Sequence, residues 1–179
     1  MAMELFEAIR DRKSIRTFID RPIEAEKVRA ILEAGTRAPS GGNRQPWRFI
    51  VVTDKEKIAK FDPYGHQDCV EKAPAILVAC ADPHDTWAKY DEEEICYRLD
   101  VSAAIQNMLL AIHGLGLGAV WVLTCSKRDI RTLVGIPGHW EIISIIPFGY
   151  FKPEANKRMT TRRPLSEVAF LENVNTPVT

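Results

Sequence analysis

The feature that most constrains the fold is one long segment, residues 95–115, which is apolar around nearly its whole circumference at helical spacing. A helix with this pattern is buried on most sides, so we expect it at the centre of the molecule. The chain of 179 residues is long enough for one domain with a substantial core. Because no repeat, low-complexity tract or linker interrupts it, we predict a single domain over residues 1–179.

Shorter helices and strands are predicted on either side of this segment. Apolar spacing indicates a helix that ends near Arg12, a second with a buried stripe over residues 28–35, and a short one over residues 127–134. Runs of β-forming residues predict strands at residues 47–53, 75–81, 119–123 and 141–150. Interleaved helices and strands indicate an α+β fold, an α/β sandwich. Residues 152–179 lack periodicity, as is typical of a C-terminal arm.

Charge and composition exclude several classes of function. The 24 basic residues balance the 24 acidic ones, so no overall basic surface indicates nucleic acid binding. The N-terminus has no apolar run of signal-peptide length, and no stretch is long enough to span a membrane. The four cysteines show no CxxC pairing, which is typical of free thiols in a reducing compartment. We therefore expect a cytoplasmic protein that binds neither nucleic acid nor membrane.

Two other kinds of site are not expected. Residues 114–119 match the GxGxxA fingerprint of dinucleotide-binding proteins, but that motif needs a strand before it and a helix after it. Here a predicted helix comes first, so the glycines indicate a helix C-cap and a tight turn. The histidines stand apart without metal-ligand spacing, so no metal site is predicted. They are His66, His84, His113 and His139.

Three polar clusters are candidates for a binding site. In an extended segment, residues two apart face the same side, so Arg12, Ser14 and Arg16 would line one edge over roughly 13 Å. Guanidinium groups suit phosphate because they donate paired hydrogen bonds. The second cluster, residues 38–47, is a Pro- and Gly-rich turn whose backbone could approach a ligand. The third, Thr161–Leu165, holds another arginine pair. Taken singly, the two basic clusters also fit a solvent-exposed surface, and residues 38–47 also fit a loop that joins a helix to a strand.

Taken together, the motifs RKSIRTF, APSGGNRQPWRFIVV, GLGLGAVWV and RRPLSEV resemble those of the FMN-dependent nitroreductase family, in the same order along the chain. The resemblance covers nearly the whole sequence. It implies a mixed sheet flanked by helices and an intertwined homodimer in which two chains build FMN sites across their interface. Residues 152–179 would then be an arm that packs on the partner subunit.

The resemblance also implies which residues hold the phosphate end of FMN. Arg12 and Ser14 match family positions that bind the phosphate and the ribityl chain, and Lys13 lies beside them. Arg162 matches a phosphate ligand near the C-terminus, with Arg163 next to it. Many relatives carry a basic residue two positions before this arginine, where the present chain has Thr160, so we expect a greater dependence on Arg12 and Arg162.

Other matches concern the flavin ring. Arg16 matches a basic position near the pyrimidine edge, where it would stabilise negative charge at N1 and O2. The segment Leu123 and Thr124 matches backbone near N5, and Gln67 or His66 is the candidate for a pyrimidine contact. The turn expected to reach the flavin from the other subunit comprises Pro39, Ser40, Gly41 and Asn43.

The implied activity is that of an oxidoreductase in which the flavin carries the chemistry, so no catalytic side chain is required. NADH or NADPH would reduce FMN, and the reduced flavin would reduce a small acceptor such as a nitro compound, a quinone or a free flavin, in a ping-pong sequence. One alternative is a specialised flavoprotein of the same fold, of dehalogenase, flavin-consuming or dehydrogenase type. The others are a non-catalytic flavin-binding module and a flavin-free structural protein.

Overall fold

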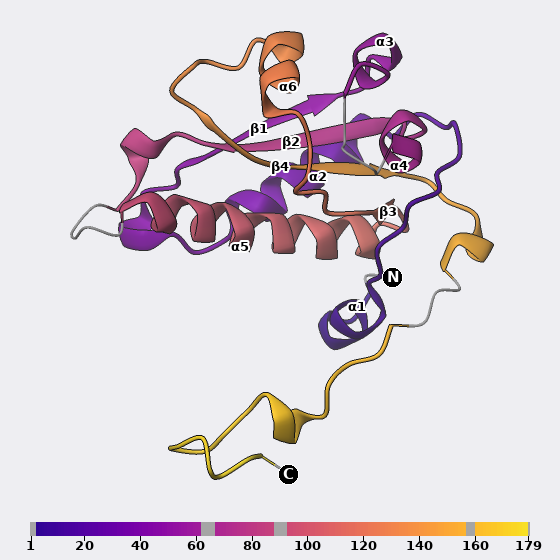
Figure 1. The fold of residues 1–179 in the computed structure, drawn as a ribbon. Helices are drawn as coiled ribbons and strands as arrows, with labels where there is room; N and C mark the ends of the chain where they lie inside the picture. Colours follow the sequence, from indigo (N-terminus) through magenta and orange to yellow (C-terminus); the bar gives the residue numbers. More distant parts are fainter. Residues whose placement is uncertain (1–2, 62–66, 88–92, 157–159, 179) are drawn as a thin grey trace.

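The structure is a computed structural model that describes residues 3–61, 67–87, 93–156 and 160–178 (Figure 1). Four strands form one sheet in the order β1-β2-β4-β3, and every pair in it is antiparallel. The strands are β1 (Trp47–Val52), β2 (Ala75–Ala81), β3 (Gly118–Ala119) and β4 (Glu141–Gly149). The α-helices are α1 (Leu5–Asp11), α2 (Ala25–Thr36), α3 (Lys55–Ile58), α4 (Gln67–Glu71), α5 (Glu93–Gly114) and α6 (Lys127–Val134).

The central strand β2 is buried along its whole length because both faces of the sheet are covered. Successive side chains of a strand point to opposite faces, so Ile76 and Val78 enter one hydrophobic core while Leu77 and Ala79 enter the other. The two cores therefore share a single sheet as their middle layer. In a separate irregularity, the register between β2 and β4 shifts at Ala79 and Cys80.

Helices cover each face of this sheet. The long helix α5 runs beneath the strands and α2 packs beside it, while α3, α4 and α6 lie on the opposite side (Figure 1). Val101, Ile105 and Met108 on α5 are almost fully buried, which confirms that this segment is the central helix. Leu99 on the same helix is 63% exposed, so α5 still presents apolar surface to solvent.

The glycine-rich sequence after α5 forms the turn that the sequence predicts. Gly116 has a φ of 74°, a left-handed conformation that glycine adopts without steric cost, and the N–H of Leu117 donates to the carbonyl of Ile112. The predicted strand over residues 119–123 is shorter than expected. Ladder pairing stops after Ala119, although the N–H of Val120 still donates to the carbonyl of Pro147 over 3.1 Å and Val122 forms an isolated bridge with Ile145.

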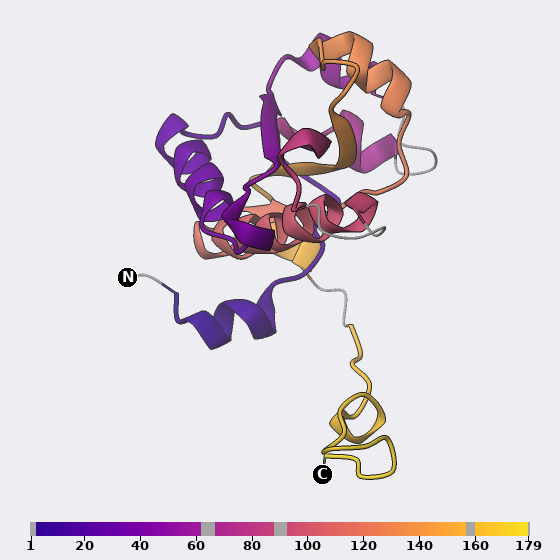
Figure 2. The same cartoon turned by 90° about the vertical axis from the view of Figure 1, so that its left-hand side faces the viewer.

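The described C-terminal residues 160–178 extend away from the layered body (Figures 1 and 2). The predicted α+β class is confirmed. The sheet was expected to be mixed, but the named strands all pair antiparallel. Among the described residues, the parallel contribution is an isolated bridge between Ser14 and Ala119. In the described ranges, no helix has both the length and the apolar character needed to cross a membrane.

Candidate functional site

The segment that follows α1 is extended and lies along the edge of the sheet. Arg12 has backbone angles of −57° and 128°, and the N–H of Ile15 donates to the carbonyl of Ala119 over 2.9 Å. Ile15 is buried, whereas the neighbouring Ser14 and Arg16 are exposed. Exposure therefore alternates over Ser14, Ile15 and Arg16, with Ile15 against the core and the two polar residues at the surface.

Arg12 lies close to Arg162, which comes from the C-terminal segment. Burial lowers the pKa of the half-buried Arg12 guanidinium, and the positive charge of Arg162 lowers it further. Two cations held near one another repel, so an anion between them would stabilise both. This is the arrangement expected of a phosphate site, because guanidinium groups bind phosphate oxygens with charge-assisted hydrogen bonds.

A small hollow opens beside Arg12, where α5 ends. Lys13 and His113 line it together with apolar residues that include Ile15, Leu117 and Phe151. Burial lowers the pKa of His113, and its Nε2 atom is buried without a hydrogen-bond partner among the described residues. His113, which the sequence shows only as one of four scattered histidines, therefore lies in the same hollow as Arg12.

The glycine-rich turn at residues 39–46 is held in an unusual backbone conformation. It contains a short 3-10 helix, η1 (Gly41–Asn43), and positive φ angles occur at Gly42, Asn43 and Gln45. The hydroxyl of Ser40 accepts a hydrogen bond from the backbone N–H of Gln45 over 3.0 Å. Pro39 and Asn43 are exposed. A hydrogen bond within the turn therefore stabilises its conformation, and several of its residues are exposed to solvent.

Two residues outside the turn support it, and the sequence motifs do not include either. Asp100 on α5 accepts a hydrogen bond from the N–H of Gly41 over 3.0 Å, while its other carboxylate oxygen is buried without a partner among the described residues. Burial raises the pKa of this carboxyl group, and the Gly41 hydrogen bond opposes that rise. Trp87 lies over the turn, 2.9 Å from the position that a Cβ on Gly41 would occupy. An acidic residue within the largely apolar segment 95–115 was the available signal for Asp100.

The remaining predicted contacts are only partly described. Leu123 is 62% exposed and Thr124 is exposed, directly after the bridge at Val122, so both residues lie at the surface of the single chain. Arg163 is exposed beside Arg162. His66 and the side chain of Gln67 lie outside the described residues, so the predicted pyrimidine contact stays a prediction.

The single chain brings some of these residues together and keeps others apart. Arg12 and Lys13 line the hollow beside His113, near the C-terminal end of α5, and the charge of Arg162 reaches Arg12. The turn at Gly41 is fastened instead to Asp100, near the N-terminal part of the same helix. At ~1.5 Å per residue, Asp100 and His113 lie roughly 20 Å apart along the axis. Within one chain, the turn and the arginine site are therefore separate.

The fold is an α+β sandwich, and Arg12 and Lys13 line a hollow beside the edge of its sheet. Comparisons with known proteins show which family this fold belongs to. A model of the nitroreductase family matches residues 9–68 and 61–150. The chain belongs to the nitroreductase family and is an oxidoreductase, as the sequence motifs predict.

Similar proteins come from distant organisms. The chain is 38% identical to an NADH dehydrogenase/NAD(P)H nitroreductase of Archaeoglobus fulgidus, over 84% of this chain and 87% of that protein. It is 26% identical to human iodotyrosine deiodinase 1, over 93% of this chain and 67% of that protein. A nitroreductase-like protein from Desulfovibrio desulfuricans, solved in complex with FMN, is 33% identical with a TM-score of 0.80, covering 97% of this chain and 99% of that one.

Proposed function

We propose that this chain is an FMN-dependent NAD(P)H oxidoreductase that reduces small acceptors such as nitro compounds and quinones. The observation that carries the proposal is the proximity of Arg12 and Arg162. The two guanidinium groups repel each other, and a bound phosphate between them would offset this electrostatic repulsion. The FMN complex of the structurally similar Desulfovibrio desulfuricans protein supports FMN as the source of this phosphate.

The residues of the arginine site fit FMN. Arg12, Ser14 and Arg162 would hold the phosphate and the start of the ribityl chain, with Lys13 and Arg163 adding positive charge nearby. The hollow beside Arg12 combines these cations with apolar side chains, as a ligand with an anionic and an organic part requires. When bound, FMN supplies the redox chemistry, accepting hydride from NADH or NADPH and passing electrons to the acceptor in a second half-reaction.

Two further segments would act on the flavin ring. Arg16 is exposed on the same side of the segment as Ser14, so its charge is available to stabilise negative charge at the pyrimidine edge. Backbone amides at Leu123 and Thr124, two exposed residues, would lie near N5. Gln67 remains our candidate for a pyrimidine contact. None of these groups needs to act as a nucleophile or a general acid.

A second copy of the chain would complete the site. The turn with Pro39, Ser40, Gly41 and Asn43 is roughly 20 Å along α5 from the arginine site of its own chain. Reaching the arginine site of a partner is therefore the natural role for this turn. Apolar side chains left exposed by one chain supply the interface. They include Leu5, Phe6, Ile9, Leu99, Leu165, Val168, Phe170, Leu171 and Val174.

The C-terminal segment fits the same assembly. Residues 160–178 lie away from the layered body and carry several of these exposed apolar residues, as an arm over a partner would (Figure 2). We therefore propose a single domain over residues 1–179, with residues 152–179 as the arm. The free cysteines, Cys69, Cys80, Cys96 and Cys125, support a cytoplasmic location, where thiols stay reduced.

Anaerobic titration with NADH and NADPH tests the activity. The purified protein should be yellow, and the visible absorbance of its oxidised flavin should decrease on addition of the preferred donor. A yellow protein that no nicotinamide bleaches would indicate a binding module. Colourless protein that does not take up added FMN would contradict the proposal. Size-exclusion chromatography with light scattering tests the assembly, because a monomer that retains stoichiometric FMN would contradict the shared site.

Reductive dehalogenation of aromatic compounds is the second candidate. It is favoured by the likeness to human iodotyrosine deiodinase 1 and by Trp87, which is 42% exposed over the Gly41–Gly42 turn and could stack on an aromatic substrate. The two candidates differ in the acceptor alone. Reoxidation of the reduced enzyme by nitroaromatics, quinones and halogenated phenols, measured in parallel, separates them.

A further inference from the structure

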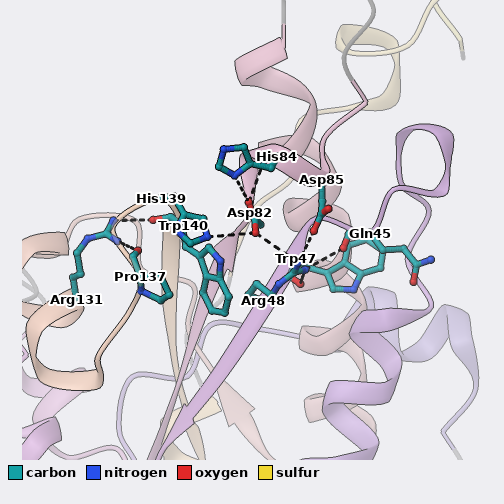
Figure 3. Close-up of polar contacts among 10 residues, drawn as sticks. All are labelled: Gln45, Trp47, Arg48, Asp82, His84, Asp85, Arg131, Pro137, His139 and Trp140. Atoms are coloured by element: carbon teal, nitrogen blue, oxygen red, sulfur yellow. Dashed lines mark hydrogen bonds and ion pairs between the residues drawn. The ribbon is translucent and has the colours of Figure 1, made fainter.

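A cluster of three side chains lies beyond the end of β2, away from the arginine site. Asp82, His84 and His139 each offer one metal-ligand atom, and these atoms lie within 4.8 Å of one another (Figure 3). One carboxylate oxygen of Asp82 is 3.0 Å from Nδ1 of His84, and the other is 3.7 Å from Nε2 of His139. The sequence predicts no metal site because these histidines are far apart along the chain, and only the fold brings them together.

The distances suit a first-row divalent ion. Zinc binds histidine nitrogen and carboxylate oxygen at ~2.0–2.2 Å in tetrahedral geometry, which places neighbouring ligand atoms roughly 3.3 Å apart. The two separations involve different oxygens of Asp82, and one ligand atom from each residue lies within 4.8 Å of the others, so small side-chain rotations would bring the three to this spacing. Imidazole with carboxylate favours zinc, nickel or copper over magnesium and calcium, which prefer oxygen alone.

The backbone around the first two ligands is fixed. Asp82 accepts a hydrogen bond from the N–H of His84 over 3.1 Å and so caps a short 3-10 helix, η2 (Pro83–Asp85). The N–H of Asp82 donates to the carbonyl of Pro46 over 2.8 Å. The Asp82 side chain is 14% exposed. The carboxylate is thus anchored before any ion binds, and its two oxygens already face the two imidazoles.

The third ligand is held by a separate set of bonds. His139 lies in the loop between α6 and β4, and Arg131 on α6 donates to the carbonyl of Pro137 and to that of Trp140, the latter over 2.8 Å (Figure 3). The His139 ring also packs edge-on against Trp140. Groups that orient ligands in this way raise metal affinity because less freedom is lost on binding.

The nearby charges also permit a cation. Arg48 on β1 lies 3.8 Å from Asp82, but its closer partner is Asp85, and it also donates to the carbonyl of Trp47 over 2.9 Å. With neutral imidazoles, two carboxylates and one guanidinium leave this group formally negative. His84 and His139 are 77% and 52% exposed, so an ion can enter from solvent and water can complete its coordination.

We propose that Asp82, His84 and His139 form a binding site for a divalent transition-metal ion, with Zn²⁺ as the ion that fits best. The ion would link η2 to the loop before β4, across the ends of two neighbouring strands. It would thereby fix the start of the segment that carries Trp87 over the Gly41–Gly42 turn. This inference is independent of the proposed activity.

Calorimetric titration of the FMN-loaded, tag-free protein with Zn²⁺ tests the site, with Mg²⁺ as the comparison ion. We expect one Zn²⁺ per chain and no comparable heat with Mg²⁺. His139→Ala and Asp82→Asn should each raise the Zn²⁺ Kd at least tenfold. Glu33→Gln, which removes an exposed carboxylate on α2 outside the cluster, should leave it unchanged. Zn²⁺ should also raise the Tm of the unmodified protein and not that of His139→Ala.

Two outcomes would overturn the proposal. One is Zn²⁺ binding no stronger than Mg²⁺ binding. The other is an equal Zn²⁺ affinity in the unmodified protein and in His139→Ala, which would place the ion elsewhere. His139 is half-exposed and caps no helix, so its removal should leave the fold intact even where loss of the Asp82 cap does not.

Discussion

Arg12 and Arg162 lie within range of each other's charge, although one follows the first helix and the other belongs to the C-terminal segment. Arg12 is half-buried and Arg162 is exposed, so an anion could reach both from solvent. This relationship is the physical basis of the proposed FMN site. It is also the reason that the two arginines should be tested together.

The double variant Arg12→Ala/Arg162→Ala should lose FMN while keeping its fold. Each charge-assisted hydrogen bond to phosphate contributes about 1.5–3 kcal/mol, so losing both should raise the FMN Kd by roughly a hundredfold or more. Flavin fluorescence during dialysis measures this, and circular dichroism checks the fold. Arg29→Ala, on the exposed face of α2, is the matched control. A double variant that still binds FMN stoichiometrically would show that neither arginine holds the phosphate.

Gly118→Ala should destabilise the protein because the backbone passes close to Ile15. A Cβ at Gly118 would lie 2.6 Å from the Cβ of Ile15, which has no room to move in the core. Overpacking of this kind costs about 1–3 kcal/mol. Chemical denaturation should show the loss, and FMN affinity should fall too, because Ile15 lies within the Arg12–Arg16 segment. Gly138→Ala, where an added Cβ meets nothing within 4 Å, should change neither quantity.

Substitutions at Asp100 should separate its hydrogen bond from its charge. Asp100→Asn keeps an acceptor for the Gly41 N–H and removes a carboxylate whose pKa burial raises, so the Tm should be unchanged or higher at neutral pH. Asp100→Ala leaves that N–H without its acceptor and should cost about 1–3 kcal/mol. Thermal melting in the presence of FMN measures both. An Asn variant as unstable as the Ala variant would show that the charge itself, and not only the acceptor, is required.

Stability should fall in acid partly because of Glu24. A hydrogen bond from the hydroxyl of Tyr150, the Glu24 backbone and the charges of Lys27 and Arg21 lower the pKa of Glu24 from 4.5 to about 2. A lowered folded-state pKa stabilises the fold above the unfolded value, and this contribution is lost as the pH falls from about 4.5 to about 2.

The comparison of Glu24→Gln with the unmodified protein isolates this contribution. The difference in urea midpoint between them should be largest near neutral pH and should shrink across that acid range. In a Tyr150→Phe background, the same substitution should have a smaller effect, because the hydrogen bond is already absent. A difference that does not change with pH would show that Glu24 acts through packing alone.

Much of the fold was predictable because its signals are local. The apolar character of α5 around its circumference, the β-forming run of β2 and the glycines after α5 each depend on neighbouring residues. The end of β3 was not predictable. Val120 and Val122 both favour a strand, but the regular ladder with β4 depends on the paths of both segments. It ends at Ala119, although the N–H of Val120 still donates to the carbonyl of Pro147.

The sequence by itself determined the α+β class, the family and the residue types that suit a phosphorylated flavin, since motifs and periodicity are properties of the chain. Only the tertiary structure decided which distant groups meet. It placed Arg162 beside Arg12, fastened Gly41 to Asp100, and gathered Asp82, His84 and His139. Contacts between residues far apart in sequence depend on the packing of several elements at once, and no local pattern records that packing.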